Sequence, residues 1–215
     1  MTVIAIDGPA GAGKSTVARA VAAALDSVYV DTGAMYRAVA LAVVEAGVDP
    51  ADAVAVAALL PDLVIEADDE RVMLGGRDVT DRIRLSDVTA LVSTVSAHPE
   101  VRAHLAALQR ALAASRDVVM EGRDIGSAVV PDAEVKVFLT ASPGERAQRR
   151  WRERPEEGTL EEVARAIAAR DEADASRSNS PLVQAADAVA IDTTGRSVEE
   201  IVEDIVALAR KRSAS

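Results

Sequence analysis

Short apolar runs rich in valine and isoleucine alternate along this chain with longer segments in which apolar residues recur at helical spacing. Continuous apolar runs are typical of strands that helices cover on both faces, whereas the longer spacing is typical of amphipathic helices. Their alternation predicts βα units and an α/β fold around a parallel sheet. The expected strands are residues 3–6, 28–31, 118–121, 135–139 and 188–191.

Helices are expected in the segments between these strands. Pro99 lies inside the third of them, where a proline ends a helix or starts a new one. Residues 63–84 interrupt the alternation of strands and helices, because short apolar runs flank an acidic turn and a Gly-Gly pair follows. That pattern predicts a small antiparallel hairpin unit. The expected helices are residues 15–25, 35–46, 86–115, 142–153, 160–176 and 198–211.

Composition narrows the class of protein. A chain of 215 residues, 49% apolar and 2% aromatic, is long enough for one α/β domain with a core of Val, Leu, Ile and Ala. The net charge of −11 argues against nucleic acid as a partner. The chain has no cysteine, and no apolar run approaches the ~20 residues that span a bilayer. With no signal peptide before Val3, we expect a cytoplasmic monomer without a membrane partner.

The first expected strand leads into a glycine-rich segment and then a helical run. The segment fits the Gly-x-x-x-x-Gly-Lys-[Ser/Thr] pattern of a phosphate-binding loop. Its glycines let backbone N–H groups face phosphate oxygens, and the helix adds the positive end of its dipole. The alternative, a plain connector between strand and helix, is disfavoured by this context. The segment consists of Gly8, Pro9, Ala10, Gly11, Ala12, Gly13, Lys14, Ser15 and Thr16.

This loop predicts a nucleoside triphosphate as ligand. Lys14 is expected to reach the β- and γ-phosphates and to contact only phosphate and solvent, and the Ser15 hydroxyl is placed to ligate Mg²⁺. The segment Asp192-Thr193-Thr194-Gly195 reads like a GTPase switch element. It follows the last expected strand, and no Asn-Lys-x-Asp segment comes after it, so a GTPase is not expected.

Two further segments follow strand ends, where open parallel sheets bind ligands. Tyr36 and Arg37 suit base stacking or phosphate binding; the alternative is a helix capped by Thr32 with Tyr36 in the core. Arg123 and Asp124 lie between two glycines. An arginine there can approach a phosphate, and a carboxylate can accept a hydrogen bond from a base amino group. The alternative for this pair is a surface turn with a local ion pair.

Arginines recur after the fourth expected strand. Such runs are usually solvated helix faces balanced by glutamates, and glutamates are close by in this sequence. Phosphoryl transfer needs cationic groups around the transferred group, so the hypothesis here is a mobile, arginine-bearing lid. The arginines are Arg146, Arg149, Arg150, Arg152, Arg154, Arg170 and Arg177.

Taken in order, these motifs resemble those of the bacterial cytidylate kinases, a family of nucleoside monophosphate kinases. The likeness covers residues 3–208, with matching segments at residues 6–16, 31–37, 122–126, 170–177 and 185–188. It implies a P-loop kinase core with a five-stranded parallel sheet covered by helices. It also implies ATP with Mg²⁺ as the donor and CMP or dCMP as the acceptor. The implied core is residues 1–34, 116–148 and 178–215, with a monophosphate-binding domain at 35–115 and a lid at 149–160.

The resemblance also implies roles for residues that match the family by position. Base recognition is implied for Ser93, Arg102 and Asp124. Contact with the acceptor phosphate is implied for Tyr36, Arg37 and Arg123, and contact with the acceptor sugar and the phosphates for Arg170, Asp174 and Arg177. The implied catalytic residues are Lys14, Arg123, Arg149, Arg150 and Arg177.

Two positions depart from the family pattern. Thr32 stands where many relatives have serine, which keeps the hydroxyl group, so Thr32 stays among the expected CMP-binding residues. Glu121 stands where others have aspartate, which keeps the charge but lengthens the side chain by one methylene. The role of Glu121 is therefore left open.

The implied reaction needs no protein nucleophile, because an oxygen of the acceptor phosphate attacks the γ-phosphoryl group in line. Three alternatives stay open. A kinase of a small metabolite such as gluconate or shikimate would not need the hairpin insert. A thymidylate or adenylate kinase should lack the set of Ser93, Arg102 and Asp124. A non-enzymatic regulator would bind ATP without transfer, which the many arginines argue against.

Overall fold

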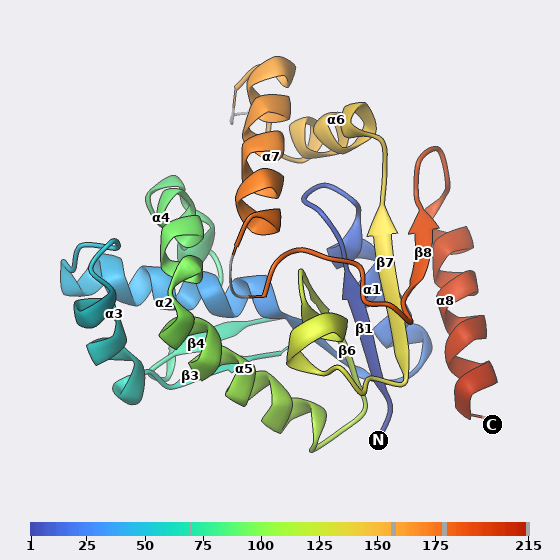
Figure 1. The fold of residues 1–215 in the computed structure, drawn as a ribbon, viewed down its shortest axis with the longest axis horizontal. Helices are drawn as coiled ribbons and strands as arrows, with labels where there is room; N and C mark the ends of the chain where they lie inside the picture. The colour runs from blue at the N-terminus through green and yellow to red at the C-terminus, as the bar shows by residue number, and fades with distance from the viewer. Residues whose placement is uncertain (69, 156–157, 178–179, 214–215) are drawn as a thin grey trace. The chain divides into compact units, whose positions relative to one another are not determined.

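The computed structural model describes residues 1–68, 70–155, 158–177 and 180–213, and it divides into two compact units (Figure 1). The first unit comprises Met1–Tyr29 and Arg116–Ser215, and the second comprises Val30–Ser115. The second unit is therefore one continuous insertion between two parts of the first. The predicted core segment 178–215 includes residues 178–179 and 214–215, which lie outside the described residues.

A five-stranded sheet forms the centre of the first unit, in the order β2-β6-β1-β7-β8. β1 pairs in parallel with β6 and β7, and β7 pairs in parallel with β8. This confirms the predicted parallel sheet, and each observed strand end lies within one residue of the expected end. The strands are β1 (Val3–Asp7), β2 (Val28–Asp31), β6 (Val118–Gly122), β7 (Val135–Thr140) and β8 (Val189–Asp192).

Helices of the first unit complete its core. Ile4 of β1 and Val137 of β7 share one apolar cluster with Val17 of α1 and Ile205 of α8. The helices α6 and α7, drawn in yellow and orange in Figure 1, pack against each other. Among the described residues, no helix is long and apolar enough to cross a membrane. The elements are α1 (Lys14–Ala24), η3 (Ile125–Val129), α6 (Pro143–Glu153), α7 (Leu160–Ala175) and α8 (Val198–Ser213).

The second unit combines helices with a three-stranded antiparallel sheet in the order β3-β4-β5. This sheet lies where the hairpin unit was expected and adds one short strand to it. Pro99 is the first residue of α5, so it starts a new helix. The elements are α2 (Thr32–Ala46), α3 (Ala53–Leu59), η1 (Leu60–Asp62), β3 (Ile65–Ala67), β4 (Val72–Leu74), β5 (Arg77–Asp78), η2 (Arg82–Arg84), α4 (Ser86–Ala97) and α5 (Pro99–Ala113).

Aspartate caps explain where the sequence interpretation differs from the structure of this unit. The Asp31 carboxylate accepts a hydrogen bond from the Ala34 N–H at 2.9 Å, so α2 begins at Thr32. The alternative in which Thr32 caps the helix is therefore wrong. Asp52 caps α3, a helix that the apolar pattern missed, by accepting bonds from two backbone N–H groups. Each cap satisfies N–H groups that a helix start leaves unpaired.

The first glycine of the phosphate loop lies against β7. Gly8 follows β1 with a φ of +150°, and a Cβ atom at Gly8 would lie 2.1 Å from the carbonyl oxygen of Leu139. That separation is far inside van der Waals contact, and the φ angle is one that other residues rarely adopt. Only glycine therefore lets the chain leave β1 alongside β7.

We expect Gly8→Ala to lower the free energy of unfolding by about 2–4 kcal/mol, because the added methyl group must push the loop away from β7. The matched control is Gly144→Ala in α6, where a Cβ atom meets nothing within 4 Å. Alanine favours a helix over glycine, so this control should be neutral or slightly stabilising. Urea unfolding followed by circular dichroism measures both. Equal unfolding midpoints for wild type and Gly8→Ala would contradict the close approach.

Candidate active site

The phosphate loop joins β1 to α1 in the predicted order of strand, glycine-rich turn and helix. Gly11 and Gly13 have φ angles of +75° and +85°, and Gly13 precedes Lys14, the first residue of α1. A helix start presents unpaired N–H groups and the positive end of the helix dipole. This end of β1 therefore has the local geometry of an anion site.

Lys14 is folded into the loop. Its side chain is only 6% exposed, and its Nζ donates a hydrogen bond to the Pro9 carbonyl oxygen at 2.8 Å. The expectation that Lys14 contacts only phosphate and solvent is therefore wrong. Burial is the main reason that the pKa of Lys14 is lowered to about 7, and the charge of Arg123 lowers it further, whereas Glu121 opposes both. An anion beside this amine favours its charged form.

An ion pair between α6 and α7 holds the middle of the phosphate loop. Arg146 of α6 pairs with Asp171 of α7. The Asp171 carboxylate accepts a bond from the Ala10 N–H at 3.0 Å, and the Arg146 guanidinium donates to the Ala10 carbonyl oxygen at 3.0 Å. Sequence reasoning grouped Arg146 with possible lid arginines and missed Asp171. The available signal was the position of Asp171 beside Arg170 in the family motif.

Arg149 connects α6 to the chain that follows β8. Its guanidinium donates to the Thr193 carbonyl oxygen at 2.7 Å, to the Thr193 hydroxyl at 2.8 Å and to Glu145 at 3.0 Å. The Thr193 hydroxyl in turn lies 3.0 Å from the carbonyl oxygen of Thr140 and 3.3 Å from that of Ala12 in the phosphate loop, and its one hydrogen is shared between these two acceptors. Thr193 belongs to the segment that was considered as a GTPase switch. Its observed role, which the sequence interpretation missed, is to link Arg149 to the phosphate loop.

Asp174 of α7 gathers two of the predicted arginines. Its carboxylate pairs with the Arg123 Nε at 2.9 Å and also with Arg177. Arg170 lies on the same helix, and its buried Nε has no hydrogen-bond partner among the described residues. Burial lowers the pKa of Arg170, and the charge of Arg123 adds to that effect. Arg123, Asp174 and Arg177 thus lie together.

The corner after β6 carries the predicted pair Arg123 and Asp124. Asp124 is buried at 4% exposure, and Arg123 pairs with α7, so the alternative of a surface turn with a local ion pair is wrong. Asp7 of β1 lies beneath this corner and accepts two backbone N–H groups from it. Glu121, whose role was left open, accepts a hydrogen bond from the Tyr29 hydroxyl at 2.5 Å.

The second unit brings together some of its own predicted residues. The Arg102 guanidinium lies over the ring of Tyr36, 5.3 Å from the ring centre, which is within the reach of about 6 Å for a cation–π contact. Tyr36 is half-buried, so it is not a core residue. Arg37 donates to the Thr89 hydroxyl at 2.7 Å. Thr32 is buried at the start of α2, and Ser93 is exposed on α4.

The donor groups around the phosphate loop suit Mg²⁺ as a companion of a nucleotide. No group of three or more His, Cys, Asp or Glu side chains that could hold a metal occurs in the described part of the chain. Ser15 is exposed at the start of α1. Mg²⁺ typically takes few protein ligands and fills its shell with phosphate oxygens and water. A single hydroxyl beside a phosphate loop is consistent with that mode of binding.

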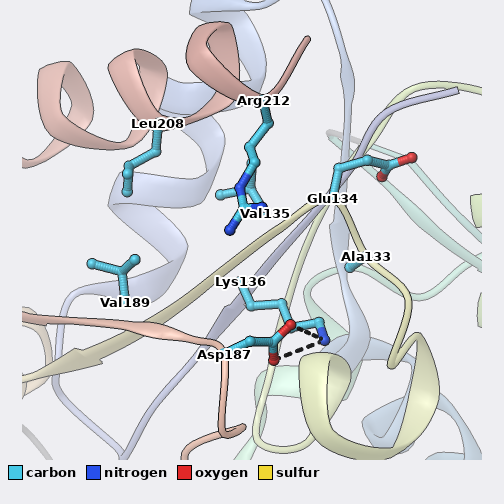
Figure 2. Close-up of a pocket in the computed structure, with 8 residues that line it drawn as sticks. All are labelled: Ala133, Glu134, Val135, Lys136, Asp187, Val189, Leu208 and Arg212. Atoms are coloured by element: carbon cyan, nitrogen blue, oxygen red, sulfur yellow. Dashed lines mark hydrogen bonds and ion pairs between the residues drawn. The ribbon is translucent and has the colours of Figure 1, made fainter. Parts of the chain in front are cut away.

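A cavity of about 200 Å³ lies elsewhere in the first unit, beside β7, β8 and α8 (Figure 2). Figure 2 shows the Lys136 ammonium bonded to Asp187 at its edge, at 2.7 and 2.9 Å. Leu208 and Arg212 reach it from α8. None of the predicted site residues lines this cavity. The candidate active site is therefore the phosphate loop with its arginines, and not this cavity.

The family model and the curated relatives that match this chain belong to one family. A family model described as cytidylate kinase matches residues 4–211. The cytidylate kinase of Geobacillus kaustophilus is 51% identical over 216 residues, covering 97% of this chain and 96% of its own. That of Halalkalibacterium halodurans is 48% identical, with 97% of each chain covered. The crystal structure of a gluconokinase from Sinorhizobium meliloti covers 99% of this chain and 94% of its own, with a TM-score of 0.50 and 18% identity, and shares the fold.

We expect Asp174→Ala to lower the free energy of unfolding by about 3–5 kcal/mol, because it leaves two largely buried arginines without their carboxylate. The side chains of Asp174, Arg123 and Arg177 are only 9%, 19% and 13% exposed. The control is Glu45→Gln, which breaks a surface pair with Arg77 whose side chains are 38% and 57% exposed. That change should alter stability by about 0–1 kcal/mol. Urea unfolding at pH 7 compares them, and similar losses in both variants would refute the expectation.

Proposed function

Because the chain belongs to the cytidylate kinase family, we propose that it transfers the γ-phosphoryl group of ATP to CMP or dCMP, giving ADP and CDP or dCDP. The observation that carries the proposal is the family match over residues 4–211. The structure supports it, because Arg123 and Arg170 lie close enough to Lys14 of the phosphate loop for their charges to lower its pKa. Two anionic substrates require cations gathered in this way.

The donor is proposed to bind at the phosphate loop, residues 8–16. Backbone N–H groups and Lys14 contact its phosphates, and Arg149 reaches the same loop through Thr193. The hydroxyl of Ser15 would hold Mg²⁺, which would supply positive charge that offsets the charge of the phosphates.

The acceptor is proposed to bind the residues that match the family by position. The proposal keeps a monophosphate-binding domain at residues 35–115, a range that lies inside the second unit, Val30–Ser115. It keeps residues 149–160 as a lid, of which residues 156–157 lie outside the described residues. The proposed CMP-binding residues are Thr32, Tyr36, Arg37, Ser93 and Arg102 in the second unit and Arg123, Asp124, Arg170, Asp174 and Arg177 in the first.

The reaction follows from positioning and charge. An oxygen of the acceptor phosphate forms the new bond to the γ-phosphorus while the bond to the bridging oxygen of ADP breaks. The negative charge spread over the transferred group is stabilised by Lys14, Arg123, Arg149, Arg150 and Arg177. Water has to be excluded, because an open site would hydrolyse ATP.

The second candidate is a related kinase that phosphorylates another small molecule, because the chain shares its fold with a gluconokinase. An acceptor screen separates the two. ADP formation from ATP is measured with CMP, dCMP, UMP, AMP, gluconate and shikimate. The proposal predicts strong activity with CMP and dCMP only, and a small metabolite as the best acceptor would overturn it.

Base selectivity should depend on Asp124. Cytosine has a 4-amino donor where uracil has a carbonyl acceptor, so a fixed carboxylate favours CMP and repels UMP. A mismatched buried polar site can discriminate by ~10⁴-fold. We expect Asp124→Ala to lower kcat/KM for CMP far more than for UMP. The measurement is the ratio of the two values at equal ATP in wild type and variant. A ratio that survives the substitution would remove Asp124 from base recognition.

Two arginines of α6, Arg149 and Arg150, should act mainly in the transition state. We expect the double variant Arg149→Ala, Arg150→Ala to lose up to ~10³-fold in kcat, because charge develops on the γ-phosphoryl oxygens during transfer. Steady-state kinetics at saturating CMP separate kcat from the KM for ATP. The control is Arg152→Ala, since this exposed arginine bonds to Gln148 of its own helix at 3.2 Å. A change confined to the KM for ATP would assign the pair to ground-state binding.

A further inference from the structure

A buried carboxylate at the end of β1 joins the central strand to the corner after β6. Asp7 is 5% exposed. Its Oδ1 accepts the Ile125 N–H at 2.9 Å, and its Oδ2 accepts the Gly126 N–H at 2.8 Å. Burying a carboxylate is unfavourable unless hydrogen bonds compensate, so these two bonds are what stabilises Asp7 in this position.

These bonds secure one side of the corner that carries Arg123 and Asp124, and the sheet secures the other. Asp7 lies opposite Gly122 in the parallel pairing of β1 with β6. The Asp7 side chain reaches past that pair to Ile125 and Gly126, the first two residues of η3. Arg123 and Asp124 are therefore enclosed between two attachments to the same residue of β1.

We propose that Asp7 is a positioning residue, which holds residues 122–126 in the conformation that presents Arg123 and Asp124 to the acceptor nucleotide. The inference rests on the proposed function, which assigns those two residues to the acceptor. Asp7 acts through the backbone of the corner, because both of its carboxylate oxygens are used by backbone N–H groups. Support of this kind controls how accurately a binding group is aimed.

Asp7 can hold the corner at residues 122–126 in this way only while its carboxylate is ionised. An ionised carboxylate accepts both N–H groups, whereas a protonated one turns an O–H donor toward one of them. Burial is the main reason that the pKa of Asp7 is raised to about 6; the two backbone bonds and Lys14 of α1 lower it, and Asp124 raises it. β7 places uncharged Phe138 in register with Asp7, and β6 places Glu121 one residue before Gly122. The support should therefore weaken as pH falls through about 6.

The decisive variant is Asp7→Asn, which keeps the shape but can accept with only one atom and turns an NH₂ group toward the other N–H. We expect kcat/KM for CMP to fall about ten- to a hundredfold, the CMP/UMP ratio to shrink, and the Kd for ATP to change less than about twofold. The control is Asp52→Asn at the start of α3. Its Oδ1 alone accepts two backbone N–H groups, which the amide oxygen of asparagine can also accept, so the kinetics of this variant should match wild type.

A pH profile adds a readout that a merely structural role would not move. The phosphates of the substrates titrate near pH 6 in every sample. Asp7 titrates in the wild-type protein only. The kcat/KM of wild type divided by that of Asp7→Asn should therefore fall as the pH is lowered from about 7 to about 5. If the variant does not fold, the wild-type profile decides. It must show a loss of kcat/KM on the acid side, near pH 6, that the substrates, titrated alone by phosphorus NMR, do not account for; protonation of Lys14 near pH 7 restores a cation and acts in the opposite direction.

The outcomes are distinct. Unchanged CMP kinetics and base selectivity in Asp7→Asn, or a loss confined to ATP affinity, would overturn the role of Asp7 and leave the proposed function standing. A ratio that does not depend on pH would overturn it as well. A wild-type protein that does not phosphorylate CMP would overturn the proposed function itself, and the positioning role with it.

Discussion

Buried arginines have to lie beside carboxylates, and in the first unit this requirement joins segments that are far apart along the chain. Asp171 pairs with Arg146, and the two together hold the phosphate loop. Asp174 pairs with Arg123 and Arg177, so it joins α7 to the corner after β6. The loop, the corner and the helices α6 and α7 therefore depend on the same few ion pairs. A change at one aspartate is expected to disturb several groups that handle phosphate.

The position of β1 explains how one strand serves several of these segments. It lies at the centre of the sheet, between β6 and β7, and its carboxyl end leads into the phosphate loop. Open parallel sheets bind ligands at this edge, where connections leave in different directions. Gly8 lets the loop pass close to Leu139 of β7, while Asp7 holds the corner that follows β6. The last residue of β1 and the residue that follows it thus position both neighbouring segments.

The sequence predicted those parts of the fold that depend on local patterns. Continuous apolar runs identified every strand of the large sheet, and the glycine and lysine spacing identified the phosphate loop. The helix α3 escaped because its run of alanine and valine has no clear helical period, and a cap at Asp52 decides its start. The partners of the site residues escaped for another reason. Thr193 lies 44 residues after Arg149, and Asp171 lies 161 residues after Ala10, so only the folded chain brings them together.

The pKa of Lys14 likewise could not be predicted from the sequence. A motif assigns it to phosphate, but only the structure reveals that it is buried against Pro9 with a pKa lowered to about 7. The sequence cannot supply this, because the pKa depends on burial and on the charges of Arg123 and Arg170, which come from distant segments. For the same reason, the motif gave the place of Asp124 but not the carboxylate of Asp7 that supports its corner.

The strengths of surface and buried charge interactions explain how an acidic protein can bind two anionic substrates. At physiological ionic strength, surface charges are screened over about 8 Å, so the net charge of −11 acts weakly on a nucleotide that is still in solvent. Charges that are buried are screened far less, and their interactions at contact are several times stronger than in water. Lys14, Arg123 and Arg170 are in that second situation. Local burial of cations therefore outweighs the unfavourable overall charge, provided that carboxylates such as Asp174 keep those cations in place.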